Sequence, residues 1–128
     1  MKIVATIARY LLGVMFLFFG SNLMFHFLPS PPMPPGAMAN FNSALAESHY
    51  GIAVGFFQAA PAILLLMNRY VPLALTVLAA EIVNILTFHI TMQPAGLPMA
   101  LVVAILWILV FLRVKDAFAG IFEPMPQR

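Results

Sequence analysis

The sequence predicts an all-α fold, an integral membrane four-helix bundle whose four transmembrane helices leave both chain ends in the cytoplasm. Three observations predict it: the composition, four long apolar runs, and the distribution of the basic residues. Of the 128 residues, 63% are hydrophobic and only 8% are charged, whereas a soluble domain carries roughly 25% charged residues. A soluble fold of this size would expose large apolar patches, and lipid is the solvent that removes this difficulty.

Four apolar runs are long enough to cross a bilayer core, which takes ~20 helical residues for ~30 Å. They cover about residues 8–28, 51–68, 71–92 and 96–113. Backbone groups in lipid must bond within their own segment, so these runs are expected to be helices. Short turns separate the last three runs, and residues 1–128 therefore form a single transmembrane domain. Small residues on the first two runs predict close helix packing; they are Gly13, Gly20, Gly51, Gly55 and Ala59.

The connection over residues 29–50 is the longest and lies on the outer side. Five prolines between Pro29 and Pro35 exclude a regular helix there. Beyond them, Met38, Phe41 and Leu45 recur at helical spacing, which predicts a short amphipathic helix on the membrane surface. An irregular cap over the bundle is the alternative.

The basic residues set the orientation. They lie before the first run, between the second and third runs, or after the fourth: Lys2, Arg9, Arg69, Arg113, Lys115 and Arg128. With four spans, all six fall on one side, which the positive-inside rule makes the cytoplasm. They form no patch of their own, so the net charge of +2 does not indicate a nucleic-acid partner. The expected surroundings are the lipid bilayer.

Polar groups inside a span are costly, so each requires a reason. They gather in the outer halves of the first three runs: Asn22, His26, Gln58, Glu81, Asn84 and His89. At ~1.5 Å per residue, Gln58 and Asn84 lie ~10 and ~12 Å below the outer ends of their helices, and Glu81 lies ~16 Å below. We therefore expect a ligand pocket inside the bundle that opens outward, with Glu81 at its floor.

Two interpretations of Glu81 stay open. As a functional group, it would accept or donate a proton, or bind a cationic or hydroxyl-bearing ligand. As a structural group, it would be a protonated carboxyl bonded to Asn84 or Gln58, an interhelical contact worth ~1 kcal/mol.

The histidines raise the question of a metal. His26, His49 and His89 fall on the outer side with Glu47 nearby, and such groups can bind zinc, copper or a haem iron. No pair has the spacing that puts two ligands on one helix face, so we expect no metal and no haem. The chain has no cysteine, which excludes a disulfide, a thiol redox pair and a thiolate-bound cluster. The cofactor stays undetermined, although a quinone would suit the pocket.

Four stretches carry a resemblance to a known family: ARYLLGVMFLFFGSN (Ala8 to Asn22), NRYVPLALTVLAAEIVNILTFH (Asn68 to His89), GLPMA (Gly96 to Ala100) and RVKDAF (Arg113 to Phe118). Together they make the chain similar, over nearly its whole length, to the DoxX family of small bacterial four-helix membrane proteins. The most specific part is NILTFH followed by PAGLPMA. The resemblance implies a multi-pass protein of the bacterial cytoplasmic (inner) membrane.

The family takes its name from membrane subunits of a thiosulfate:quinone oxidoreductase. Other members are linked to oxidative-stress complexes, and distant relatives to receptor assembly or cargo export. The family supplies no accepted catalytic set, so Glu81, Asn84 and His89 are carried over as pocket residues only. The vitamin K epoxide reductase core is similar in outline, but its chemistry requires cysteines.

Three functions follow from these features. The favoured one is an accessory or ligand-binding subunit of a quinone-linked membrane redox system, with Glu81, Asn84 or His89 handling protons on the quinone oxygens. The chain holds no catalytic motif and no electron carrier, so whether it is an enzyme stays undecided and a redox partner protein would be needed. The alternatives are a non-catalytic assembly or partner-binding protein, and a small proton-coupled transporter, which would need at least a homo-oligomer of two chains to form a path.

Overall fold

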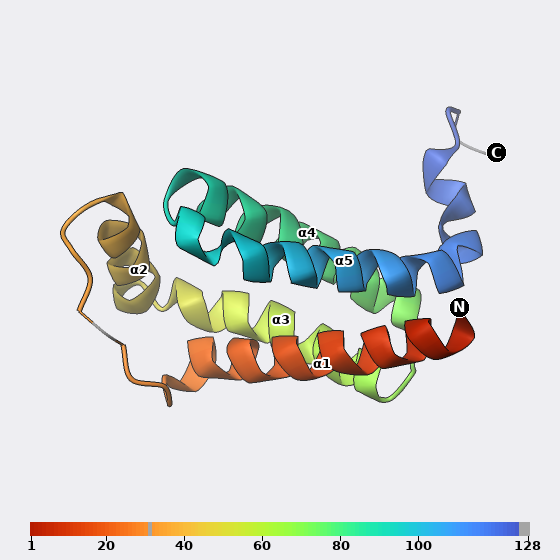
Figure 1. Cartoon of the computed structure of the whole chain (residues 1–128), viewed down its shortest axis with the longest axis horizontal. Helices are drawn as coiled ribbons and strands as arrows, with labels where there is room; N and C mark the ends of the chain where they lie inside the picture. Colours follow the sequence, from red (N-terminus) through yellow and green to blue (C-terminus); the bar gives the residue numbers. More distant parts are fainter. Residues whose placement is uncertain (31, 126–128) are drawn as a thin grey trace.

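The computed structural model describes residues 1–30 and 32–125, and each element within them is helical (Figure 1). The prediction of an all-α fold is therefore confirmed. Pro31 of the proline-rich segment and Arg128, which served to predict the orientation, lie outside the described residues. The elements are α1 (Lys2–Phe25), α2 (Ala37–Glu47), α3 (Tyr50–Leu66), α4 (Val71–Thr91), the 3₁₀ helix η1 (Pro94–Gly96), α5 (Leu97–Val114) and the 3₁₀ helix η2 (Lys115–Phe122).

Three helical stretches are long and apolar enough to cross a membrane: Lys2–Phe25, Val71–Thr91 and Pro94–Phe122. A fourth results if α2 and α3, which meet at 85°, are counted as one span. All four long helices carry exposed large apolar side chains. Water solvates such a surface poorly, so these helices indicate a multi-pass membrane protein.

The helices begin and end close to the predicted runs, with the largest difference in α1. This helix already begins at Lys2, because Arg9 does not interrupt it: the guanidinium donates to the carbonyl oxygen of Leu65 and lies 4.5 Å from the ring centroid of Tyr10. The helix ends at Phe25, earlier than the predicted residue 28. There His26 adopts a left-handed backbone (φ 52°) and its N–H donates to the carbonyl of Asn22.

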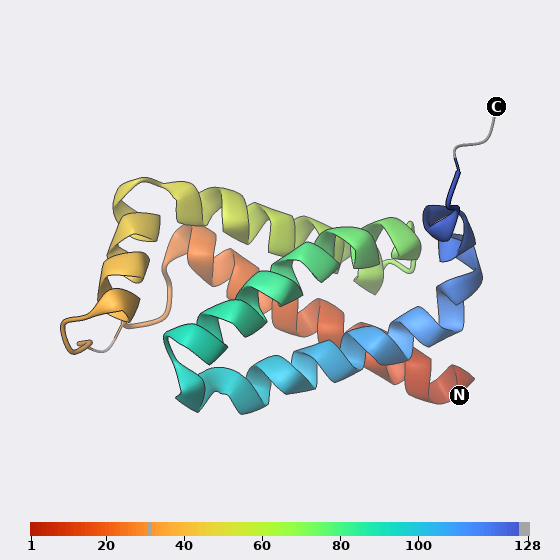
Figure 2. The same cartoon turned by 90° about the horizontal axis from the view of Figure 1, so that it is seen from above.

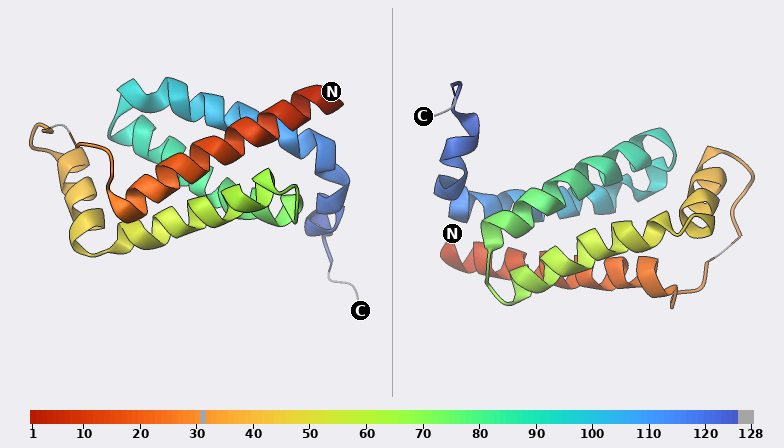
Figure 3. Two further views of the ribbon diagram at one scale, coloured as in Figure 1. Left: turned by 90° about the horizontal axis from the view of Figure 1, so that it is seen from below. Right: turned by 180° about the vertical axis from the view of Figure 1, so that it is seen from behind.

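The long helices form two antiparallel pairs, α1 with α3 and α4 with α5 (Figures 1 and 2). The pairs contact each other through α1 with α5 and through α3 with α4. They diverge toward the end of the molecule where α2 lies crosswise (Figure 3). The space that the site occupies results from this divergence.

Within the first pair, α1 and α3 touch backbone to backbone at Gly20 and Gly55. A Cβ on Gly55 would lie 2.5 Å from the carbonyl oxygen of Gly20, and a Cβ on Gly20 would lie 2.8 Å from that of Gly55. No side chain fits at this crossing. The predicted close packing of the small residues is confirmed here.

Apolar side chains close the opposite end of the molecule. Fully buried leucines from three helices meet there, among them Leu12, Leu65 and Leu75. Trp107 of α5 donates its indole N–H to the carbonyl of Leu75 in α4 at 2.9 Å, and its ring stacks on Phe111 with centroids 5.2 Å apart. The second helix pair is thus joined by a side chain that bonds the neighbouring backbone.

The close crossing of α1 and α3 predicts that alanine substitutions at two glycines of α3 differ sharply in their effect on stability. Gly55→Ala should lower the free energy of unfolding by about 1–3 kcal/mol, because the new methyl group overpacks a backbone contact. Gly51→Ala is the matched control, since its Cβ would meet the nearest atom at an ordinary 3.4 Å. Thermal unfolding in detergent measures both. Equal midpoints for the two variants would contradict the crossing.

Candidate functional site

A cavity of about 960 Å³ lies where the two helix pairs diverge. Its volume is within the range of ligand pockets, roughly 300–1,000 Å³. All five α-helices contribute side chains to its wall. The cavity is open, because lining residues such as Phe57 and Met99 keep 52% and 54% of their surface exposed. A ligand can therefore reach it without unfolding of the bundle.

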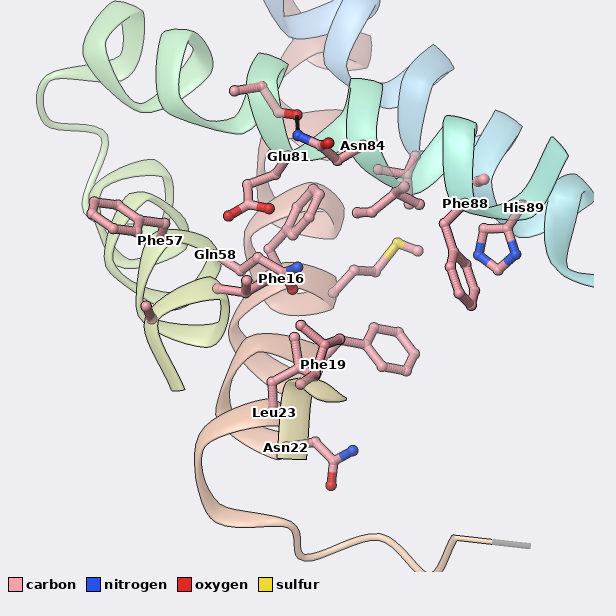
Figure 4. A pocket seen from close by; sticks show the side chains of 18 of the residues that line it. Phe16, Phe19, Asn22, Leu23, Phe57, Gln58, Glu81, Asn84, Phe88 and His89 are labelled. Carbon is pink, nitrogen blue, oxygen red and sulfur yellow. Dashed lines mark hydrogen bonds between the residues drawn. The ribbon is translucent and has the colours of Figure 1, made fainter. Parts of the chain in front are cut away.

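Gln58 and Glu81 form the polar group at the inner end of the cavity. Gln58 comes from α3 and is only 5% exposed, while Glu81 comes from α4 and is half-buried. The carboxyl of Glu81 points toward the amide of Gln58, with the ring of Phe16 beside them (Figure 4). Two helices from different pairs thus bring an acid and an amide together, as the estimated depths in the sequence predicted.

Asn84 and His89 extend the polar wall along α4, and both also line the cavity. The amide nitrogen of Asn84 donates to the carbonyl of Ala80 at 2.9 Å (Figure 4). The Nδ1 of His89 lies 3.2 Å from the carbonyl oxygen of Gln93. A carbonyl only accepts, so Nδ1 carries the proton of this bond.

A glycine fixes the position of the His89 ring. Gly96 lies directly against the ring, and any Cβ at this position would overlap the imidazole. Gly96 belongs to the turn that joins α4 to α5. The turn therefore holds His89 in its place on the cavity wall.

Asn22 and His26, both predicted as pocket residues, have different positions. Asn22 lines the cavity, and its Oδ1 accepts the backbone N–H of Leu28 at 2.9 Å. His26 is exposed and is not among the lining residues. The prediction for His26 needs correction, because α1 ends at Phe25 and the left-handed His26 begins the turn out of the helix.

The contribution of α2 to the wall was not predicted. Phe41, Asn42 and Leu45 of this helix line the cavity, and the ring of Phe41 packs against Phe88 of α4 with centroids 5.3 Å apart. The predicted short helix is confirmed and replaces the alternative of an irregular cap. The helical spacing of Phe41 and Leu45 in the sequence indicated that they share one apolar face. It did not indicate that this face lines the cavity.

The residues considered for a metal do not converge. Among the described residues, no three histidine, aspartate or glutamate side chains are placed to hold a metal ion. Of the four residues considered, His89 alone lines the cavity, while His26, His49 and Glu47 are exposed near the ends of other helices.

The character of the cavity follows from its lining. Six aromatic side chains face it, and the described lining includes no lysine or arginine. Its polar side chains are one carboxyl, one imidazole and four amides: Glu81, His89, Asn22, Asn42, Gln58 and Asn84. Such a wall suits a lipophilic molecule that carries hydrogen-bonding groups.

Comparisons with known proteins leave the site to be interpreted from its own residues. No family model, curated protein or solved structure matches the chain. The resemblance to the DoxX family therefore stays a prediction from the sequence.

The packing of His89 on Gly96 predicts a non-additive pair of substitutions. Gly96→Ala should lower the free energy of unfolding by about 1–3 kcal/mol, because the methyl group and the ring compete for one space. Adding His89→Ala should relieve most of this loss. Gly120→Ala is the control, since a Cβ there meets no atom within 4 Å. Additive losses in the double variant would show that the ring lies elsewhere.

Proposed function

We propose that the chain is a four-span protein of the DoxX type, an accessory subunit of a quinone-linked redox system that binds a lipophilic ligand from the bilayer. One observation carries the proposal: an open, largely apolar cavity has a carboxyl and a buried amide, Glu81 and Gln58, at its inner end. In a chain with an apolar outer surface, such a cavity is reached from the lipid. The polar pair then gives a ligand a fixed orientation.

The helix lengths support four spans. At ~1.5 Å per residue, the 17 residues of α3 cover ~26 Å, which is at the short end of known spans. The described basic residues also support chain termini in the cytoplasm. Lys2 and Arg9 lie in α1, Arg69 lies between α3 and α4, and Arg113 lies in the last turn of α5. The N-terminus and η2 lie at the same end of the molecule (Figure 1). These positions are consistent with a bacterial inner membrane protein with both termini inside.

A quinone matches the cavity in shape and polarity. Its flat ring would lie among aromatic side chains such as Phe16, Phe19 and Phe88, and its oxygens would meet Glu81 and Gln58. The isoprenoid tail would leave past the exposed Phe57 or Met99 into the lipid. The chain's own residues bind and orient the ring, while a redox partner protein supplies the electron carrier.

The proposed topology predicts the labelling of single cysteines, which are unambiguous because the chain has none of its own. Ser43→Cys on α2 should react with an impermeant maleimide in intact spheroplasts. Asn68→Cys, beside Arg69, should react only after the membrane is permeabilised. Both positions are exposed, so burial does not account for a difference. Labelling of both cysteines in intact spheroplasts would contradict the topology.

The proposed ligand binding predicts the effect of filling the cavity. Native mass spectrometry of the protein, gently extracted from its own membrane, should detect a bound quinone. Ala80→Trp, which introduces a large side chain at a lining position, should reduce its occupancy at least about tenfold, because ring and indole compete for the same volume. Leu73→Trp, at an exposed position of α4 outside the cavity, should keep full occupancy. Wild-type protein that carries only ordinary phospholipid would contradict the proposal.

A further inference from the structure

We infer that η2 (Lys115–Phe122) is a surface helix that binds anionic phospholipid headgroups, at the end of the bundle opposite the cavity. The inference rests on the proposed four-span arrangement, which puts this end of the bundle at a membrane surface. It goes beyond the proposed ligand, because η2 would bind lipids of the bilayer itself. Three observations carry it: the direction of η2, its exposed apolar side chains and the positive charge around it.

The direction of η2 differs from that of the spans. The 18 residues of α5 cover ~27 Å, which nearly crosses a bilayer core without η2. The regular helical backbone then breaks at Val114 (φ −119°, ψ 16°), and η2 runs crosswise to the four long helices (Figures 1 and 3). A helix that turns crosswise just beyond the end of a span lies along the membrane surface.

The apolar side chains of η2 are suited to that position. Residues three apart share a face of a 3₁₀ helix, so Phe118 and Ile121 lie on one side of η2. Phe118 is buried, with its ring centroid 5.2 Å from that of Phe111 in α5, while Ile121 is 70% exposed. Phe122 and Met125 are exposed as well. The side of η2 that packs on the bundle thus extends past it as an apolar surface, which can enter the boundary between headgroups and acyl chains.

Positive charge dominates the same end of the molecule. Arg113 lies in the last turn of α5 and Lys115 begins η2, next to the apolar side chains. Each basic residue close to an anionic membrane surface contributes about fivefold in affinity. The charged side chains exposed at this end are four cations and two carboxylates: Lys2, Arg69, Arg113, Lys115, Asp116 and Glu123.

The crosswise helix at the other end, α2, lacks this combination. Its sequence contains no basic residue, and the ring of Phe41 packs against Phe88 in the cavity wall. The preference for anionic headgroups is therefore assigned to η2.

A pair of single cysteines tests the position of η2 in nanodiscs. A fluorescent label is attached at Ile121→Cys or, as the matched control, at Ala117→Cys, which is exposed on another face of the same helix. Nitroxide-labelled lipids should quench the label at position 121 at least about twofold more than that at position 117, and aqueous iodide should do the reverse. Quenching of both labels by iodide alone would put η2 in water and overturn the inference. A label at position 121 that neither agent quenches would mean that a second protein chain covers this face, and would overturn it as well.

Lipid selectivity tests the role of the charges. The full chain in detergent is titrated with equal amounts of phosphatidylglycerol and phosphatidylcholine that carry the same acyl chains, and bound lipids are counted by native mass spectrometry. Phosphatidylglycerol should bind at least about fivefold more. Arg113→Gln combined with Lys115→Gln should bring this ratio close to one. Arg113→Lys combined with Lys115→Arg keeps both charges and should retain the preference.

The outcomes separate this inference from the function on which it rests. An unchanged lipid ratio in the glutamine variant would overturn the assignment to η2. It would leave the proposed quinone-binding role intact, because neither measurement involves the cavity. Labelling of both Ser43→Cys and Asn68→Cys in intact spheroplasts would overturn the four-span arrangement and this inference with it.

Discussion

The backbone contact between Gly20 and Gly55 is the constraint on which the rest of the structure depends. It brings α1 and α3 together without intervening side chains, and it also fixes Gln58, one turn further along α3. A Cβ on Gly20 would lie 2.9 Å from the Cβ of Gln58, so the base of this side chain is held against the α1 backbone. Packing therefore fixes where this long side chain starts, on the side of α3 from which its amide meets Glu81.

The cavity exists because the two helix pairs meet at one end and diverge at the other. Within each pair, a polar side chain bonds to a backbone carbonyl of the neighbouring helix: Arg9 to Leu65 and Trp107 to Leu75. Asn84 of α4 behaves differently, since its amide bonds to a carbonyl of its own helix. It does not join helices, and its side chain lines the cavity.

Hydropathy predicted the helices, because a bilayer imposes the length and the helical state of each apolar run. The orientation inferred from the basic residues stays a prediction. The helix spacing likewise placed Glu81 and Asn84 on one face and at the depth of Gln58. The end of α1 was not predictable, because the left-handed backbone of His26 depends on a local turn that apolar composition does not encode. The direction of α2 depends on tertiary contacts of Phe41, which no periodicity in the sequence specifies.

The hydrogen bond of Trp107 has a spectroscopic consequence. The chain contains one tryptophan, and its indole is bonded to α4 and stacked on Phe111. It is not among the residues that line the cavity. The tryptophan fluorescence of this protein, excited apart from its tyrosines, therefore reports on the seam between α4 and α5. Emission that shifts when a ligand is added would mean that the two helices have moved relative to each other, and a constant emission would mean a rigid second pair.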